Sequence, residues 1–249
     1  MANALNIDLW FWRLDAPGAH IERWQRYLND AEMARMAKFV FEHDRARFTI
    51  CRSRMRRILG QYTGTNPGDI AFATTGRDKP VLAGANPRAI AFNLTHTGGL
   101  ACLAVSHGEA VGVDLELIRD VREDFIVYAL NPPEHAPILA LDPAAREPAF
   151  FRYWTAKEAF LKATGTGLWR SLKTFDADVP LETAPHAFAP CALPRIDDPA
   201  ERARNWQLYT FTPTPEHVGA LACAPPPGTA LNLRTRWIAT PAATAPRAQ

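Results

Sequence analysis

The hydrophobic positions change their period along the first half of the chain, and each change marks a predicted helix or strand. Apolar and polar residues alternate over much of Ile7–Arg13, as in a β-strand. Apolar residues recur at helical spacing in Ile21–Lys38 and again in Asp44–Tyr62. Shorter runs bounded by turn residues predict three further strands, at Asp69–Thr75, Ala89–Leu94 and Leu100–Ser106.

The second half of the chain begins the same order of elements again. Val111–Arg119 reads as a strand, and Asn131-Pro132-Pro133 divides the helical stretch Asp124–Leu141 into two. Glu147–Thr164 is predicted as a long helix that stops at Gly165. Residues 180–201 are rich in Pro and Ala and predict an irregular excursion. Three strands complete the prediction, at Leu172–Asp178, Trp206–Thr212 and Val218–Cys223.

A weak internal repeat relates the two halves. Ile7-Asp8-Leu9 resembles Val113-Asp114-Leu115, and both long helices end in Thr-Gly, at residues 63–64 and 164–165. We therefore expect an α+β fold of two similar α/β lobes related by a pseudo-two-fold axis, each with a small, mainly antiparallel sheet packed against helices. The predicted boundaries are 1–108 for the N-terminal lobe, 109–235 for the C-terminal lobe and 236–249 for a flexible tail.

Composition and charge exclude several classes of protein. Of the 249 residues, 47% are hydrophobic and 22% charged, which is typical of a globular protein with a substantial core. The net charge of +2 is too small to indicate a nucleic-acid binder. The four cysteines have no metal-binding spacing and are expected as buried free thiols. With no signal-peptide pattern and no membrane-spanning stretch in sight, we expect a cytoplasmic protein.

Three acidic residues are candidates for a metal site. Asp114 and Glu116 project from the same face of their predicted strand, where the alternative is an ordinary solvated face. Together with Glu158 they would suit an oxygen-preferring cation such as Mg²⁺. In the first half of the repeat Trp10 stands in the place of Glu116, so one metal site is expected rather than two.

Glu158 and Lys162 are one helical turn apart, in the order that favours a surface ion pair, and such a pair is the alternative to a functional role when the two are taken alone. The stretch Asn93–Gly99 offers two threonine hydroxyls, the His96 imidazole and two glycines. It predicts a phosphate-binding turn, and an ordinary glycine-rich hairpin is the alternative.

Six arginines crowd the helix predicted for Asp44–Tyr62, and a guanidinium group binds phosphate bidentately. This indicates a polyanionic ligand, although a solvated helix face and a nucleic-acid ligand are alternatives. The six arginines are Arg45, Arg47, Arg52, Arg54, Arg56 and Arg57, and Arg77 and Lys79 follow in a turn.

Taken in order, these motifs resemble the 4′-phosphopantetheinyl transferase superfamily, in particular its larger, monomeric, surfactin-synthetase-activating type. The resemblance spans roughly residues 35–170. Its most specific part is the pair Gly112-Val-Asp-Leu-Glu116 and Trp154–Lys162; the motifs at Asp44–Arg56, Gly76–Pro80 and Asn93–Thr97 support it. Thr95 and Thr97 depart from the serines that are commoner there, but keep the hydroxyl group.

The resemblance implies a transferase that moves the 4′-phosphopantetheine arm of coenzyme A to a serine of an apo carrier protein, with Mg²⁺, releasing adenosine 3′,5′-bisphosphate. It implies Asp114, Glu116 and Glu158 as metal ligands, and Glu158, Lys162 and Asp114 as catalytic residues. The residues that it implies for coenzyme A are Arg35, Arg47, Lys79, Thr95, His96, Lys157 and Lys162. The carrier is expected to be a small acidic helical domain that docks near Phe125–Leu130 or Pro132–Glu134.

Two other functions stay open at this point: a non-catalytic module that binds coenzyme A or a carrier, and, less favoured, a nucleic-acid-binding protein. The intact acids and Lys162 argue against the first, and the lack of a recognisable nucleic-acid-binding motif argues against the second. We expect no nucleic acid and no membrane among the partners. A monomer is expected, because the internal repeat would replace a dimer.

Overall fold

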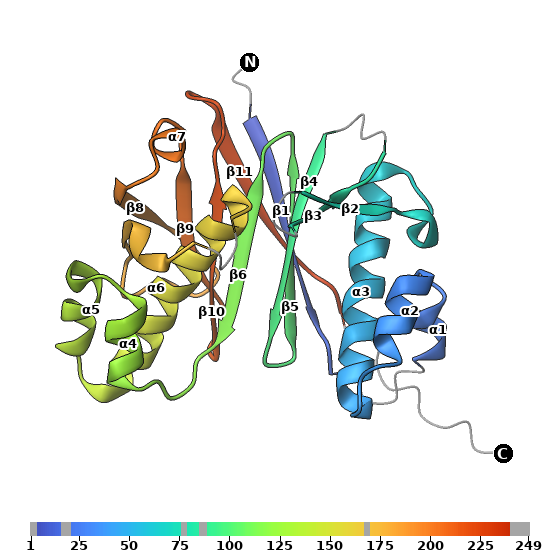
Figure 1. Cartoon of the computed structure of the whole chain (residues 1–249), viewed down its shortest axis with the longest axis horizontal. Helices are drawn as coiled ribbons and strands as arrows, with labels where there is room; N and C mark the ends of the chain where they lie inside the picture. Colours follow the sequence, from blue (N-terminus) through green and yellow to red (C-terminus); the bar gives the residue numbers. More distant parts are fainter. Residues whose placement is uncertain (1–3, 16–20, 76–78, 85–88, 167–169, 240–249) are drawn as a thin grey trace.

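The computed structural model describes residues 4–15, 21–75, 79–84, 89–166 and 170–239. Within these ranges the chain forms two lobes, and each lobe combines a small sheet with one long helix (Figure 1). The predicted α+β class and the two-lobe arrangement are therefore confirmed. The predicted tail from residue 240 onward and the turn at Gly76–Asp78 lie outside the described residues.

A four-stranded sheet with the order β11-β1-β5-β4 forms the centre of the first lobe. Its helical side carries a 22-residue helix and shorter elements. The strands of this sheet are β1 (Ala4–Arg13), β4 (Ile90–Thr97), β5 (Leu100–His107) and β11 (Ala230–Trp237). The other elements are α1 (Glu22–Gln25), α2 (Asp30–Met36), α3 (Glu42–Thr63), the 3₁₀ turn η1 (Pro67–Asp69) and the hairpin β2 (Phe72–Thr75) and β3 (Lys79–Leu82).

The last described strand corrects the predicted lobe boundary. β11 runs parallel to β1, from Ala4 opposite Ala230 to Phe11 opposite Trp237. Residues 230–235 were expected in the C-terminal lobe and 236–249 as a flexible tail, so both assignments are wrong for this strand. The single helix predicted over Ile21–Lys38 is also divided, because Asn29 caps a new helix, α2.

A five-stranded antiparallel sheet with the order β6-β10-β9-β8-β7 forms the second lobe. The expected irregular excursion at 180–201 is wrong in part, because it contains β8 and α7. The strands are β6 (Val111–Leu117), β7 (Phe175–Asp178), β8 (Phe188–Ile196), β9 (Gln207–Thr214) and β10 (His217–Cys223). The helical elements are α4 (Glu123–Ala129), α5 (Pro132–Leu139), α6 (Pro143–Thr164), η3 (Leu172–Thr174) and α7 (Pro199–Arg202).

The order of the strands shows the repeat more clearly than the sequence does. Three neighbouring strands of each main sheet pair in matching order, β1-β5-β4 in the first lobe and β6-β10-β9 in the second. The helices α3 and α6 both have 22 residues and end at a glycine in the left-handed conformation, Gly64 with φ of 72° and Gly165 with φ of 76°. The weak sequence repeat therefore corresponds to a repeated arrangement of elements.

The two sheets pack against each other at the centre of the molecule, and the long helices cover their outer faces (Figure 1). One face of β1, with Ile7, Leu9 and Phe11, shares a core with Val113 and Leu115 of β6. The opposite face of β6 therefore turns toward α6, and it carries Asp114 and Glu116. β4 of the first lobe lies beside β6, and Asn93 Oδ1 accepts a hydrogen bond from Val113 N at 2.8 Å.

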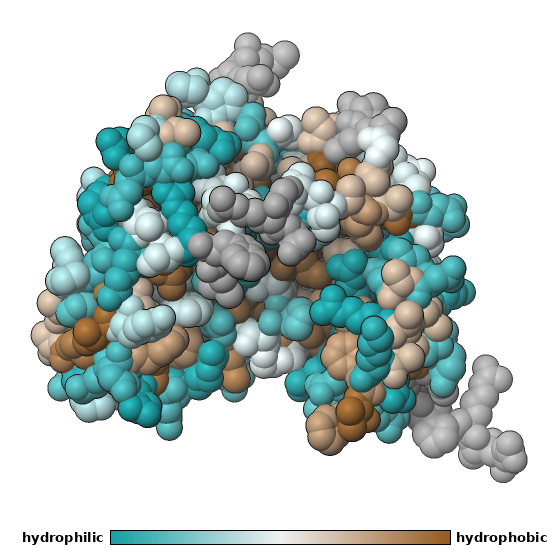
Figure 2. Space-filling view, viewed as in Figure 1, coloured by the Kyte–Doolittle hydropathy of each residue, from teal (hydrophilic) through white to brown (hydrophobic). Residues whose placement is uncertain are grey.

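The outline of the molecule is indented between the two lobes at the lower edge of the space-filling view, and hydrophilic residues cover most of the visible face (Figure 2). Among the described residues, no helix is both long enough and apolar enough to cross a membrane. Cys51, Cys102 and Cys223 are buried, Cys191 is half-buried, and all four carry free thiols, as expected.

Candidate active site

Asp114 on β6 is the centre of a polar cluster between the sheet and α6. It is 4% exposed. Its Oδ1 accepts hydrogen bonds from Lys162 Nζ at 2.5 Å and from Thr95 Oγ1 at 3.2 Å. Burial raises the pKa of Asp114, and the ammonium of Lys162 opposes this increase. One carboxylate thus joins α6 of the second lobe to β4 of the first.

α6 contributes Glu158 and Lys162 from adjacent turns. The ammonium of Lys162 pairs with Asp114, so the alternative of a surface pair between Glu158 and Lys162 is wrong. Glu158 is 7% exposed, and burial together with the charge of Asp114 raises its pKa to about 7. Glu158 therefore lies on the side of α6 that faces the acids of β6.

The donor set fits a divalent cation in part. No group of three or more His, Cys, Asp or Glu side chains is arranged closely enough, within the described part of the chain, to hold a metal ion. Two buried oxygens, Asp114 Oδ2 and Glu158 Oε1, have no hydrogen-bond partner among the described residues. Such oxygens are costly to bury alone and are the ligands that Mg²⁺ prefers.

Glu116 is held differently from the other two acids. Its Oε2 accepts from Arg119 Nη1 at 2.9 Å and from Thr97 Oγ1 at 3.4 Å. It would have to release Arg119 in order to bind a cation on that oxygen. Sequence reasoning missed Arg119 as a site residue, because its contact with Glu116 forms just beyond the end of β6.

β4 brings Thr95, His96 and Thr97 to the lobe boundary. The alternative of an ordinary hairpin is correct for the glycines, because Gly98 and Gly99 form the tight turn between β4 and β5 with φ of 50° and 76°. The hydroxyls of both threonines point to the acids of β6. The strand, rather than a glycine loop, therefore presents the polar groups.

His96 lies among three cationic groups. Partial burial and the positive charges of Lys162, Arg35 and Arg47 lower its pKa. Arg47 also bonds Asp15, with Nε 2.7 Å from Oδ1, and Arg35 lies over the ring of Phe48. A neutral imidazole beside this much positive charge is suited to an anionic ligand.

Most of the arginine-rich helix serves the structure of the first lobe. Arg52 and Arg56 both pair with Glu32, each with a nitrogen 2.6 Å from a carboxylate oxygen. Arg54 is buried against Trp24. Arg57 also lies over Trp24, and Arg45 donates to the Phe39 carbonyl. The prediction of a polyanion-binding stripe is therefore wrong for Arg52, Arg54 and Arg56, which are paired or buried within the lobe. Arg47 is the member of the group that lies near His96.

Lys79 makes a different contact from the one expected. Its Nζ donates to the carbonyl oxygens of Val111, Lys162 and Ala163 at 3.1, 2.7 and 3.2 Å. Burial, with a smaller contribution from Arg204, lowers the pKa of Lys79 to about 8. The side chain borders a cavity of about 430 Å³. The ammonium thus binds the end of α6 from the opposite lobe, and the aliphatic stem is the part left to contact an adenine.

The prediction that Lys157 contacts coenzyme A is wrong. Lys157 is fully buried, and its Nζ donates to Glu134 Oε1 at 2.5 Å and to the Phe175 carbonyl at 2.7 Å. Lys157 directly precedes the site residue Glu158, but consecutive residues of a helix point about 100° apart, so the two side chains face different surroundings. Glu134 is 2% exposed, so the predicted carrier contact at Pro132–Glu134 is internal at this residue.

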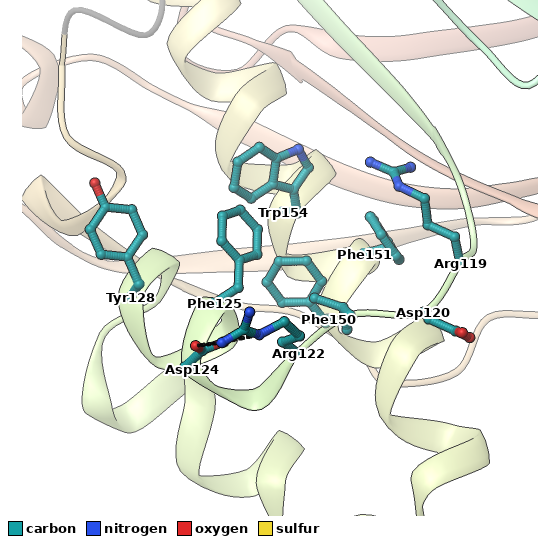
Figure 3. A pocket seen from close by; sticks show the side chains of 10 residues that line it. Arg119, Asp120, Arg122, Asp124, Phe125, Tyr128, Phe150, Phe151 and Trp154 are labelled. Atoms are coloured by element: carbon teal, nitrogen blue, oxygen red, sulfur yellow. Dashed lines mark hydrogen bonds and ion pairs between the residues drawn. The ribbon is translucent and has the colours of Figure 1, made fainter.

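A cavity of about 640 Å³, lined by aromatic and charged side chains, opens between α4, α6 and the segment after β6 (Figure 3), and Arg119, which pairs with Glu116, borders it. Phe125 faces Trp154 and Phe150, with ring centroids 5.6 and 5.8 Å apart. Arg119 lies over the ring of Phe151 on the side near Glu116. Of the predicted docking stretch, Phe125 and Tyr128 line this cavity, whereas Ile126, Ala129 and Leu130 belong to the core.

The first lobe contains a counterpart of Asp114 in which both oxygens have protein partners. Asp8 Oδ2 accepts from the Tyr62 hydroxyl, and its Oδ1 lies 3.3 Å from Arg236 Nε. Trp10 stands where the second lobe has Glu116 and donates to the Tyr62 oxygen at 2.8 Å. Arg236 comes from β11, the strand that sequence reasoning missed.

At the lobe boundary, two acidic oxygens that lack donors among the described residues lie next to hydroxyl and cationic groups of the other lobe, an arrangement typical of proteins that act on phosphorylated ligands. Comparison with known proteins agrees. The family model of the 4′-phosphopantetheinyl transferase superfamily matches residues 110–222, and the model described as 4′-phosphopantetheinyl transferase, N-terminal, matches residues 16–108.

Similar proteins carry the same description. The 4′-phosphopantetheinyl transferase HetI of a Nostoc species is 34% identical over 221 residues, 88% of this chain and 87% of HetI. The 4′-phosphopantetheinyl transferase psf-1 of Bacillus pumilus is 29% identical, over 82% of this chain and 88% of its own. Sfp of Bacillus subtilis is 24% identical, over 69% and 78%. The chain belongs to the 4′-phosphopantetheinyl transferase superfamily, which confirms the resemblance drawn from its motifs.

Proposed function

We propose that the protein transfers the 4′-phosphopantetheine arm of coenzyme A to a serine of an acyl or peptidyl carrier protein. The observation that carries this proposal is the Asp114–Lys162 pair, 2.5 Å long, beside the buried Glu158. It joins the motif GVDLE to the motif WTAKEAFLK in one cluster, at the boundary with the lobe that carries His96.

Coenzyme A would lie across the lobe boundary. Arg35, Arg47 and His96 would bind its 3′-phosphate and pyrophosphate, supported by the positive charges of Arg35, Arg47 and Lys162 around the imidazole. Thr95 would offer its hydroxyl, and the stem of Lys79 would border the adenine. Asp114 and Glu158, with Glu116 after release of Arg119, would hold Mg²⁺, which neutralises charge on the pyrophosphate.

The chemistry is an attack of the serine oxygen on the β-phosphorus of coenzyme A. One O–P bond forms, and the bond from the β-phosphorus to the adenosine 3′,5′-bisphosphate leaving group breaks. Glu158, directly or through a water that it holds, would take the serine proton. Lys162 would turn from Asp114 to the phosphate and balance the charge that develops there, since phosphoryl transfer depends mainly on alignment and charge stabilisation.

The carrier would dock at the cavity beside α4, with its serine directed to Glu158. Tyr128 is 76% exposed and Phe125 41%, so this rim offers apolar surface to a partner. Arg119 and Arg122 border the same cavity together with Asp120 and Asp124, and Arg122 pairs with Asp124. An acidic domain would compete with Asp124 for Arg122. Tyr128→Ala should raise the KM for the carrier and leave the KM for coenzyme A unchanged; the opposite pattern would refute this placement.

The test of the proposed function is a direct measurement of the product. The protein is incubated with coenzyme A, Mg²⁺ and an apo carrier protein, and the carrier is weighed by mass spectrometry. We expect a gain of one phosphopantetheine, its loss with EDTA and its return with added Mg²⁺. Glu158→Gln should lower the rate by at least about 100-fold with an unchanged melting temperature. Transfer at the wild-type rate by Glu158→Gln, or transfer independent of metal, would contradict the assigned roles.

A further inference from the structure

Each lobe contains a buried ion pair built on the same plan. A short helix begins with an Asn-x-x-Glu capping box, Asn29 with Glu32 in α2 and Asn131 with Glu134 in α5. The capping glutamate then pairs with a cation in the middle of the long helix of its lobe, Arg56 in α3 or Lys157 in α6. Arg56 and Lys157 each stand eight residues before the glycine that caps their helix, Gly64 in α3 and Gly165 in α6.

In the second lobe the pair ties three elements together. Glu134 accepts from Asn131 N at 2.8 Å and from Ala177 N at 2.9 Å, and it pairs with Lys157. Lys157 also donates to the Phe175 carbonyl and lies 4.5 Å from the centre of the Phe175 ring. The contacts join α5, α6 and β7, and both charged side chains are removed from water.

The first lobe repeats these contacts with other residue types. Arg56 is fully buried, pairs with Glu32 and donates to the carbonyls of Pro67 and Ile70. It lies over Phe72, the counterpart of Phe175 at the start of the next strand. The plan is thus common to both lobes.

The residue that follows the buried cation differs between the lobes. Arg57 follows Arg56 and points to Trp24, away from the lobe boundary. Glu158 follows Lys157, is buried, and stands one helical turn before Lys162, which bonds Asp114, so it lies on the face of α6 that meets Asp114. Since neighbouring helical residues are fixed about 100° apart, a buried ion pair at one position sets the rotation of the helix and hence the direction of the next side chain.

We propose that the Glu134–Lys157 pair is a positioning device that holds Glu158 against Asp114, whereas Glu32–Arg56 serves stability alone. The proposal rests on the proposed function in that Glu158 is taken as a working group of the transferase. Lys157 does not touch the ligand in this assignment. It acts through the orientation of α6, as residues behind a metal ligand do.

The experiment compares matched variants of the full chain, Lys157→Met and Arg56→Met, with Glu134→Gln as a milder second break of the pair and Lys157→Arg as the conservative variant that copies Arg56. Melting temperature, Mg²⁺ affinity in the presence of coenzyme A by calorimetry, and kcat and KM by mass spectrometry are measured well below all melting transitions. Both methionine variants should melt earlier than the wild type.

Lys157→Met and Glu134→Gln should lose about 10–100-fold in kcat and in Mg²⁺ affinity, with KM for coenzyme A nearly unchanged. Arg56→Met should keep kcat within about twofold of the wild type, because Arg56 belongs to the other lobe and contacts neither Asp114 nor Glu158. Lys157→Arg should retain most of the wild-type kcat and Mg²⁺ affinity. The double variant Lys157→Met/Glu158→Gln should bind Mg²⁺ no more weakly than Glu158→Gln alone, because the carboxylate that Lys157 positions is already absent.

Two results would overturn the proposal: Lys157→Met and Glu134→Gln with wild-type kcat and Mg²⁺ affinity, or Arg56→Met with losses as large as theirs. A wild-type protein that transfers nothing would instead reject the proposed function. The Mg²⁺ affinities of the variants would in that case still decide whether the pair positions Glu158.

Discussion

Gly112 of β6 packs closely against the backbone of α6, and the substitution Gly112→Ala tests how tightly the site depends on that contact. A Cβ at Gly112 would lie 2.1 Å from the Ala159 carbonyl oxygen and 2.3 Å from Ala163 N. These are backbone atoms of α6, so no side-chain rotation can relieve the overlap. The helix itself has to move.

The structure gives the size of that movement. Ordinary contact with a Cβ begins near 3.4 Å, so α6 must retreat by about 1.3 Å from the Ala159 side. Overpacking of this kind costs about 3 kcal/mol when the backbone must shift. For a chain of this length that corresponds to a fall in melting temperature of about 6–12 °C. A displacement of about 1 Å between Asp114 and the two α6 residues that face it should also slow transfer about 100-fold.

The assay pairs thermal unfolding with carrier modification measured far below the transition, so that loss of fold and loss of alignment are separated. Gly68→Ala is the matched control, because the nearest atom to its new Cβ is the Arg26 carbonyl oxygen at 3.9 Å. The control should match the wild type in both measurements. A Gly112→Ala protein with the melting temperature and transfer rate of the wild type would refute the close-packing argument.

Two further predictions concern the first lobe. Asp8→Asn should lower the melting temperature by a few degrees, because the weakened contact with Arg236 costs about 1 kcal/mol. The transfer rate should stay within about twofold of the wild type, because Asp8 is the counterpart without a metal role. A rate loss as large as that of Asp114→Asn would contradict this. Lys79→Met should destabilise the protein by about 1–3 kcal/mol in urea unfolding, because carbonyl groups at the end of α6 lose their donor. An unchanged unfolding midpoint would show that this contact between the lobes does not contribute to stability.

Local patterns predicted the elements whose stability is local. α3 and α6 were found from helical spacing and from the Thr-Gly ends, and β6 from its alternation. β8 was missed because Pro190 and Pro194 interrupt its pattern, although proline is tolerated where a strand does not need that N–H. β11 was missed because its partner β1 lies more than 220 residues earlier, and a pairing so distant leaves no trace in the strand itself.

The same limit explains the errors at the site. Lys157 and Glu158 are adjacent in a motif, and the sequence does not say which of them faces the acids; α5, which brings Glu134, decides it. The arginine-rich helix suggested a ligand because Glu32, which pairs with Arg52 and Arg56, comes from a separate helix. Charge clusters in a sequence therefore overstate binding wherever the partner acid is remote.

Asp8 and Asp114 show what separates a structural acid from a reactive one when sequence context is nearly equal. Each follows an apolar residue on the first strand of its lobe, and each is buried against the long helix. Asp8 has donors for both oxygens, the Tyr62 hydroxyl and Arg236. Asp114 Oδ2 and Glu158 Oε1 lack donors among the described residues. An acid with a complete set of protein donors has no coordination left for a ligand, so the proposed chemistry is placed at the unsatisfied pair of the second lobe.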